Sequence, residues 1–170
     1  MSECLIIPCS ERKVHFEEPM PAIQVFDGVL ARVIRKRNPG LPVYVVSAKY
    51  GLIHKDDMIE EYEISPEAVL SREYVVEKII GNWLKITDGK PNMYDTIWHI
   101  TRGASFQAIQ ILGKWSTMKH VLPEEIPQRH NIGVMLRELK AFCIARPTFS
   151  DIDLDHLISM YEQAKSEGKV

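Results

Sequence analysis

The sequence predicts a three-layer α/β protein in which helices flank a mainly parallel sheet of about four to five strands. The first observation is an alternation of short apolar runs, typical of buried strands, with segments whose apolar residues keep helical spacing. The second is the composition, because 170 residues with 45% hydrophobic and 26% charged side chains are ordinary for one globular domain. No repeat or low-complexity segment marks an internal boundary, so we expect a single domain over residues 1–170.

The predicted strands are short apolar runs bounded by turn signals. Residues 43–46 are rich in β-formers and follow Asn38-Pro39-Gly40, which ends the preceding element. A continuous apolar run of this kind fits a strand covered on both faces, as in a parallel sheet. Similar runs predict strands at 5–8, 96–100 and 118–122, and alternation predicts a short edge strand at 58–64.

The predicted helices lie between these strands and after them. Pro21 suits the first turn of a helix whose apolar spacing continues to Ile34. Together with the strands at 5–8 and 43–46, this helix predicts a right-handed βαβ unit. Apolar stripes predict further helices near 74–84, 106–112 and 135–142. The last predicted helix covers 151–164, with Leu154, Leu157, Ile158 and Tyr161 turned inward.

The bulk properties narrow the function class. A net charge of -2 and a pI near 6.3 give no global field for nucleic acid or membrane, although a local basic patch stays open. The three cysteines show no zinc spacing and their odd number fits a reducing compartment. No leader-like or membrane-spanning run is found, so we expect a cytoplasmic protein without a metal or cofactor. The oligomeric state is left open.

Polar segments directly follow three of the predicted strands, at residues 9–13, 47–51 and 101–103. The carboxyl ends of parallel strands meet at one edge of a sheet, and ligands of open α/β sheets bind there. The predicted edge gathers four cations, Arg12, Lys13, Lys49 and Arg102, with hydroxyl groups among them. Such an edge favours an anion, most simply a phosphate.

Four motifs in this part of the chain carry a family resemblance. They are Cys9-Ser10-Glu11-Arg12-Lys13, Pro21-Ala22-Ile23-Gln24-Val25-Phe26, Val46-Ser47-Ala48-Lys49-Tyr50-Gly51-Leu52 and Glu61-Tyr62-Glu63. Their order and spacing resemble a largely uncharacterised family of bacterial, archaeal and phage proteins. That family combines a strand ending in Cys-Ser-x-x-Lys with a Ser-Ala-Lys-Tyr-Gly-Leu loop and a tyrosine-centred segment.

The resemblance implies a function as well as a fold. The family looks distantly similar to the YaaA-type peroxide-stress proteins and to the archaeosine-synthase core domain, which acts on tRNA. It therefore implies an α/β fold like that of uracil-DNA glycosylases and an action on nucleobases or nucleic acids. Two positions depart from the pattern. Glu61 stands where the family usually has proline, and Val14 follows Lys13 where the archaeosine enzymes have proline.

Each candidate at the first segment has a structural alternative. Cys9 is a candidate nucleophile, because neighbouring cations and loop amides favour a thiolate. The alternative is a small buried residue at a strand end. Ser10 and Lys13 formally match the Ser-x-x-Lys pair of penicillin-binding enzymes, but no Lys-Thr-Gly follows. We expect Ser10, Arg12 and Lys13 to bind phosphate or a base edge instead.

The second and third segments supply further candidates for substrate binding. Ser47 offers a hydroxyl, Lys49 a charge and Tyr50 a ring that can stack on a base, while Gly51 allows a sharp turn or a close approach to a ligand. The alternative is a tight turn with Tyr50 against the core and Lys49 solvated. Arg102 and Gly103 stand at a predicted helix start and resemble an anion site, but a lone Arg-Gly pair is a motif of low specificity.

Candidates for acid–base chemistry are more scattered. The family resemblance implies that Tyr62 and Glu63 lie at the same edge of the sheet. The alternative is that they belong to an edge strand whose tyrosine is half buried. Glu63 and Glu11 are the nearest carboxylates for a general base, and His130 in a polar loop is a further candidate. His99, within a strand, is typical of a core histidine. The end of the first predicted helix carries a basic run, Arg32, Arg35, Lys36 and Arg37. It either follows a nucleic-acid backbone or is simply a solvated helix end.

These observations leave two functions from different classes. The first is an enzyme that acts on a nucleobase, nucleotide or nucleic acid, as an N-glycosidase or a nucleobase-modifying transferase or hydrolase. The second is a module that binds a nucleotide or nucleic acid without turnover. An enzyme is expected to have a carboxylate, a histidine or Cys9 at the bottom of the edge, whereas a binding module needs only basic and aromatic groups.

Overall fold

The computed structural model describes residues 2–9, 17–26, 28–47, 49–60, 75–122, 132–146 and 161–168. In these ranges the chain begins with β1 (Glu3–Pro8), β2 (Met20–Pro21), α1 (Ala22–Val25), α2 (Val29–Arg37), β3 (Val43–Ser47), β4 (Gly51–His54) and β5 (Met58–Ile59). It continues with the π-helical turn η1 (Val75–Ile79), α5 (Ile80–Ile86), β6 (Thr96–His99), α6 (Gly103–Ile109), the 3-10 turn η2 (Gln110–Lys114), β7 (Thr117–His120) and α7 (Ile132–Ile144).

The main sheet has five strands in the order β4-β3-β1-β6-β7. β1 lies in the centre and pairs in parallel with β3 on one side and with β6 on the other. β7 extends the parallel part beside β6, and β4 runs antiparallel at the opposite edge. The predicted strands at 5–8, 43–46, 96–100 and 118–122 are therefore found within one or two residues, and the prediction of a mainly parallel α/β sheet is confirmed.

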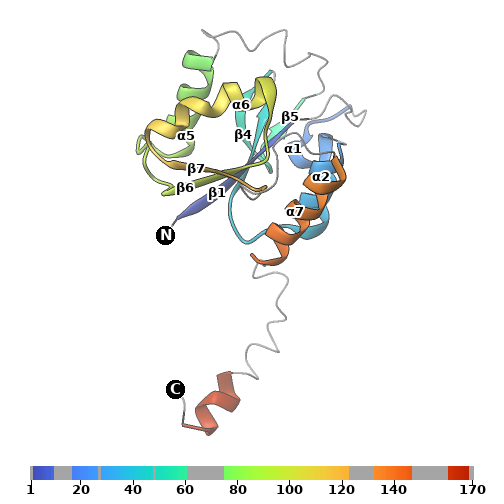
Figure 1. Ribbon diagram of the computed structural model, residues 1–170, viewed down its shortest axis with the longest axis vertical. Coiled ribbons are helices and arrows are strands. Elements are labelled where there is room, and N and C mark those ends of the chain that lie inside the picture. Colours follow the sequence, from blue (N-terminus) through green and yellow to red (C-terminus); the bar gives the residue numbers. More distant parts are fainter. Residues whose placement is uncertain are drawn as a thin grey trace.

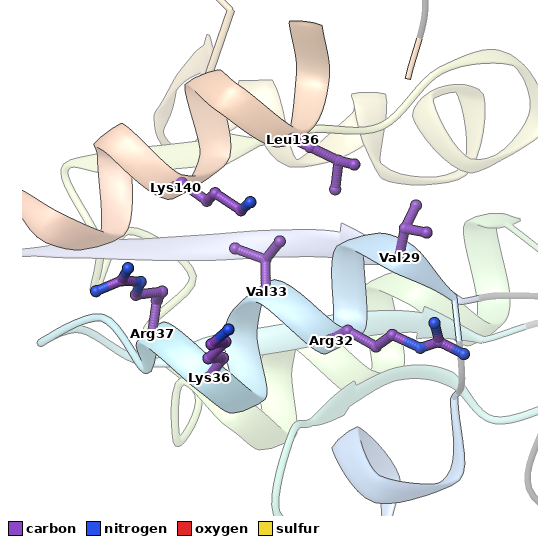
Figure 2. Close-up of a pocket in the computed structure, with 7 residues that line it drawn as sticks. All are labelled: Val29, Arg32, Val33, Lys36, Arg37, Leu136 and Lys140. Atoms are coloured by element: carbon purple, nitrogen blue, oxygen red, sulfur yellow. The ribbon is translucent and has the colours of Figure 1, made fainter. Parts of the chain in front are cut away.

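Helices cover both faces of this sheet and complete three layers (Figure 1). The two helices α2 and α7 cover one face and run side by side in the same direction (Figure 2). The helices α5 and α6 lie on the other face. Successive side chains of a strand point to opposite faces, so Leu5 and Ile7 of β1 face the α2 layer, whereas Cys4 and Ile6 face the α5 and α6 layer.

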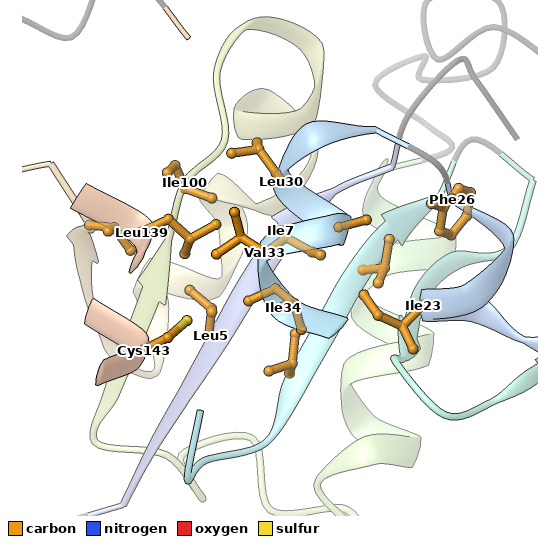
Figure 3. Packing of buried hydrophobic residues seen from close by; sticks show 14 of the residues in the cluster. Leu5, Ile7, Ile23, Phe26, Leu30, Val33, Ile34, Ile100, Leu139 and Cys143 are labelled. Carbon is orange, nitrogen blue, oxygen red and sulfur yellow. The ribbon is translucent and has the colours of Figure 1, made fainter. Parts of the chain in front are cut away.

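The core beneath α2 consists mainly of buried aliphatic side chains. Figure 3 shows the core beneath α2, where Leu30, Val33 and Ile34 come from the inward face of the helix and meet Leu5 and Ile7 of the sheet. Each of these side chains is at most 9% exposed. Because burial of one large aliphatic side chain is worth about 1.5–3 kcal/mol, the inward face of α2 holds this helix to the sheet.

The core on the other face is centred on aromatic side chains. Trp83 of α5 is fully buried, and its Nε1 donates to the carbonyl of Pro91 at 2.9 Å. The hydroxyls of Tyr44 and Tyr94 form a buried hydrogen bond of 2.7 Å beside it. Every polar atom of these rings therefore has a partner, as burial of Tyr and Trp requires.

The fifth strand of the main sheet differs from the predicted one. The sequence predicts an edge strand at 58–64, but β4 at Gly51–His54 takes the edge, because a hairpin folds it directly back onto β3. β5 pairs instead with β2 in a separate two-stranded antiparallel sheet. Residues 61–64 lie outside the described ranges.

The helix predicted from Pro21 to Ile34 is divided into α1 and α2. Phe26 leaves the helical conformation with φ -76° and ψ 116°, and Gly28 then caps α2. Arg35 of α2 reaches back, and its Nη1 donates to the carbonyls of Ile23 at 2.9 Å and Phe26 at 2.8 Å. The guanidinium thus satisfies carbonyls that the end of α1 leaves unpaired.

The predicted C-terminal helix is described only at its end. Residues 161–166 are helical. Tyr161, expected to point inward, is 58% exposed, so that part of the prediction is wrong. An apolar spacing alone does not bury a side chain when no described element packs against it. The other three side chains expected to point inward lie outside the described ranges. No helix in the described residues is long and apolar enough to span a membrane.

Candidate functional site

The parallel pairing brings the ends of β3, β1 and β6 to one edge of the sheet. Pro8 lies opposite Val46, and the next residue, Cys9, donates its backbone amide to the carbonyl of Val46 at 3.0 Å. On the other side Ile6 lies opposite His99. The segments that follow these strands therefore start at nearly the same level. We call this the carboxyl edge.

The segment after β3 is a tight hairpin turn into β4. Ser47 is fully buried, and its Oγ accepts the backbone amides of Lys49 at 3.3 Å and Tyr50 at 3.2 Å. Gly51 then adopts a left-handed φ of +80°. The Ser47 hydroxyl thus shapes the turn, in the way that serine side chains stabilise local turns.

Gly51 is also required by a close neighbour. A Cβ at this position would lie 2.2 Å from Oδ1 of Asn82 and 2.7 Å from Cγ of Lys78. The same Asn82 oxygen accepts the backbone amide of Leu52 at 3.0 Å. The glycine therefore admits the side chains of η1 and α5 to the hairpin, which is a structural reason for the glycine expected here.

Lys49 and Tyr50 project from this turn together. The Nζ of Lys49 lies 5.2 Å from the centre of the Tyr50 ring, within the range of a cation–π contact. The Tyr50 hydroxyl accepts the amide of Glu60 at 3.1 Å, and the half-buried ring packs against the core beneath α2. Lys49 is exposed. The ring thus holds the ammonium group near the edge.

The segment after β6 leads directly into α6. Thr101 is 2% exposed, whereas Arg102, which precedes the helix, is exposed and extended with φ -142°. Gly103 has φ +57°, and a Cβ there would meet no atom within 4 Å. Glycine is therefore favoured by its backbone angle and not by a lack of space. Arg102 and Lys49 come from strands on opposite sides of β1.

Two histidines lie side by side at the ends of β6 and β7. His99 pairs with His120 in the strand register, and their ring centres are 4.7 Å apart in an edge-to-face arrangement. His99 is 5% exposed and stacks on Phe106 of α6 at 5.1 Å. Its Nδ1 lies 2.9 Å from the Thr101 hydroxyl and accepts the Thr101 amide at 3.3 Å. His99 is thus a hydrogen-bonded interior residue, as its place within a strand indicates.

The hydrogen bonds assign the tautomer of both rings. The Nδ1 of His120 accepts the backbone amide of Leu122 at 3.0 Å, so the neutral ring carries its proton on Nε2. That Nε2 is buried without a hydrogen-bond partner among the described residues. The same reasoning places the proton of His99 on Nε2. His120 therefore presents a buried donor at the carboxyl edge.

Burial keeps both rings neutral. Desolvation, followed by the charge of His120, lowers the pKa of His99 from 6.5 to about 4. The pKa of His120 is also lowered by burial, with the backbone of Thr101 opposing the shift and Arg102 adding to it. Both imidazoles are uncharged near neutral pH, which is the form that accepts or relays a proton.

Cys9 lies at the same edge but on a different layer from the histidines. Its half-buried side chain packs against the core beneath α2, while His99 packs against α6 on the other face. This position fits the structural alternative of a thiol at a strand end. Its role as a nucleophile stays a prediction.

Several predicted residues cannot be placed at the edge, because they lie outside the described ranges. They are Ser10, Glu11, Arg12, Lys13, Tyr62, Glu63 and His130. Conversely, sequence reasoning missed His120, and it placed Thr101 in a polar segment without giving it a role of its own. The available signal was a histidine in each of two predicted strands that follow one another along the chain. The residues of a strand do not reveal, however, which strand it pairs with. No group of three or more potential metal ligands is found among the described residues.

Comparisons with known proteins leave the family open. No protein-family model matches the chain, and no curated protein matches it. Among solved structures, the chain is similar to one described as the crystal structure of AF0587, a protein of unknown function. The match has 14% identity and a TM-score of 0.49, and it covers 89% of this chain and 47% of that one. The chain thus spans about half of that neighbour.

Proposed function

We propose that this protein is an enzyme that acts on a nucleobase, nucleotide or nucleic acid, of a glycosidase or base-modifying type, at the carboxyl edge. The observation that carries the proposal is the sheet order β4-β3-β1-β6-β7. From β1 the chain passes first to β3 on one side and later to β6 on the other. The crevice at such a reversal is where open α/β sheets bind their ligands.

The charges at this edge favour a phosphate-bearing ligand. Lys49 and Arg102 flank β1 from the two neighbouring strands, and both side chains are exposed. The predicted cations of the segment after β1, Arg12 and Lys13, would add to them. A guanidinium binds two phosphate oxygens at once, and an ammonium adds a point charge. We therefore assign phosphate binding to Lys49 and Arg102.

The histidines support turnover over binding alone. In the proposed reaction the Nε2–H of His120 donates to an oxygen or nitrogen of the base or leaving group that carries developing negative charge. His99, which is itself hydrogen-bonded to Thr101, packs edge-to-face against that ring. A preorganised hydrogen-bond donor of this kind contributes typically about 10²–10³-fold to a rate. Cys9, Glu11, Glu63 and His130 remain the candidates for the nucleophile or base.

The first test is a thermal-shift screen against nucleobases, nucleosides, nucleotides and short oligonucleotides. A ligand at 100 times its Kd stabilises the native state by about 2.7 kcal/mol, which is readily measured as a rise in Tm. We expect this shift in the wild type and in Lys90→Ala, an exposed lysine in the segment before β6, which lies beside the amino end of β1 and so at the opposite end of the sheet from the carboxyl edge. We expect its loss in Lys49→Ala and in Arg102→Ala.

The second test separates an enzyme from a binding module. A ligand found by the screen is incubated with wild type and His120→Leu, which removes the Nε2–H donor, and release or alteration of its base is followed by chromatography. We expect the wild type to turn the ligand over, and His120→Leu to bind it but to turn it over at least 100-fold more slowly. Binding without turnover in the wild type would establish the binding module instead. Absence of a Tm shift with every ligand would refute the proposal.

A further inference from the structure

Helices α2 and α7 form a groove that the proposed reaction does not use. It has a volume of about 240 Å³ and lies on the outer surface of this helical layer (Figure 2). Val29, Val33 and Leu136 form its apolar floor. Four cations line it, Arg32, Lys36 and Arg37 from α2 and Lys140 from α7, and none of the described acidic side chains does. In a chain of net charge -2, this is a strong local segregation of charge.

The helix dipole does not account for all of these cations. Basic residues in the last turn of a helix are favoured by its negative end, and Arg35, Lys36 and Arg37 occupy that turn of α2. However, Lys140 lies before the last turn of α7, which holds no basic residue. Arg35, the remaining member of the run, turns away from the groove to bind carbonyls of α1. The cations of the basic run therefore have different roles: Arg35 binds backbone carbonyls, whereas its neighbours on the other face of the helix line the groove.

The acidic side chain of α7 does not pair with the cations of the groove. Glu138, the acidic residue of α7, pairs with Arg137 at 3.4 Å, and neither residue lines the groove. In the described part of the chain, we find no ion pair or side-chain hydrogen bond for Lys36, Arg37 or Lys140. Like charges held around one groove repel each other unless a bound anion compensates them. The groove is therefore suited to a ligand with several negative charges.

The groove begins near the carboxyl edge. Leu30, at the start of α2, lies close to Ile100 at the end of β6 (Figure 3). From there Val29, Val33 and Arg37 follow the groove away from the edge (Figure 2). A polymer with one residue at the carboxyl edge can therefore continue along this track. A free nucleotide bound at the carboxyl edge is too short to extend along the groove.

We propose that the groove between α2 and α7 binds the phosphodiester backbone of a single-stranded nucleic acid whose neighbouring nucleotide occupies the carboxyl edge. This inference rests on the proposed function and narrows its substrate class from nucleotides to a strand. Arginine and lysine side chains bind the phosphates, and the apolar floor lies beneath the sugar and base. Because such contacts release counterions, they make the affinity strongly dependent on salt.

The test measures binding of a fluorescein-labelled 12-nucleotide single strand by fluorescence anisotropy between 50 and 300 mM salt. The groove variant combines Lys36→Gln, Arg37→Gln and Lys140→Gln, all at exposed positions. The control variant removes three charges elsewhere, through Lys85→Gln, Lys90→Gln and Lys114→Gln, which are also exposed. Both variants change the net charge equally, so a difference between them reports position. Circular dichroism and Tm establish that each is folded.

We expect the groove variant alone to lose affinity. Each lost phosphate contact on a single strand lowers the slope of log K against log salt by about 0.7, so three contacts lower it by about 2. With equal affinity at 1 M salt, this corresponds to about 100-fold weaker binding at 0.1 M salt. The control variant and the Tm shift of the groove variant with a mononucleotide should match the wild type.

Four other outcomes would overturn the inference. Equal oligonucleotide binding by the groove and control variants would show that the groove does not bind the phosphodiester backbone. Equally tight binding of poly-glutamate, lost in the same variant, would assign the groove to an acidic polypeptide. A rise in Tm with a mononucleotide, without oligonucleotide binding, would refute a single-stranded nucleic acid as the ligand but leave the proposed function standing. Failure of both ligands would refute the proposed function as well.

Discussion

At Gly51 a single side-chain atom is excluded for two independent reasons. The backbone angle of +80° is one that side chains disfavour, and the site of a Cβ is already occupied by Asn82. Gly81, on α5, has open space where a Cβ would lie and is not among the glycines with positive φ. The two glycines therefore respond oppositely to the same substitution.

We expect Gly51→Ala to lower the free energy of unfolding by about 2–4 kcal/mol, since backbone strain and a steric overlap add. Gly81→Ala should raise it by about 0.4–1 kcal/mol, because alanine restricts the unfolded chain and favours the helix. Urea denaturation of both variants checks this. Equal effects of the two substitutions would contradict the geometry at Gly51.

Burial and charge are strongly opposed at His99. Its pKa is lowered to about 4 from 6.5, mainly by desolvation. The unfolded chain therefore binds the proton more readily than the native protein. The stability of the native state is unaffected above pH 6.5 and falls as the pH decreases toward 4.

We predict that His99 alone removes on the order of 3 kcal/mol of stability between pH 6.5 and pH 4. His120 acts in the same direction, since its pKa is also lowered. Urea denaturation at half-unit steps of pH measures the loss, and His99→Gln should show a shallower one. Parallel curves for wild type and variant would mean that His99 is not the group that titrates.

At the scale of elements, the break between α1 and α2 is stabilised by a side chain from the second helix. A helix end leaves carbonyls that must find donors. Nη1 of Arg35 supplies donors to two of them, at Ile23 and Phe26. This contact explains why one arginine in a basic run has a structural role while its neighbours line a groove.

We expect Arg35→Met to destabilise the protein by about 1–2 kcal/mol, because two carbonyls lose a charged donor. Lys36→Met, in the same turn of α2, loses the same favourable interaction with the helix dipole but no such hydrogen bond in the described structure. It should change stability by less than about 0.5 kcal/mol. Chemical denaturation of the two variants compares them, and equal losses would argue against the capping role.

At the scale of the whole molecule, the sheet is protected unevenly. β1 lies between two parallel neighbours, and its residues 4–7 are fully buried. β7 ends the sheet on one side, and its side chains alternate between exposed and partly buried. Local opening is easiest where few buried contacts must be broken.

Hydrogen exchange should therefore be slowest for the amides of β1 and β3 and faster for those of β7. The central amides open only with the whole domain, so their exchange follows global stability. Exchange measured by NMR at neutral pH tests this order, and a destabilising variant such as Gly51→Ala should accelerate β1 in proportion. Faster exchange in β1 than in β7 would contradict the central position of β1.

Most of the regular structure was predictable because its signals are local. The strand at 43–46 is an apolar run of β-formers, and those residues carry the preference wherever the strand lies. β4 was missed, since Gly51 and Ser47 act through a turn and through contact with Asn82, which comes from a distant helix. The break at Phe26 was missed for a similar reason, because Arg35 makes it tolerable from nine residues away.

The sequence by itself determined the fold class, the main strands and the polar segments that follow them. Only the tertiary structure decided which of those segments are neighbours, that His99 meets His120, and that α2 and α7 place four cations around one groove. The physical reason is that strand and helix preferences depend on neighbouring residues of the chain. Strand order, the pairing of side chains and their burial depend on contacts between residues far apart in sequence, which no local pattern encodes.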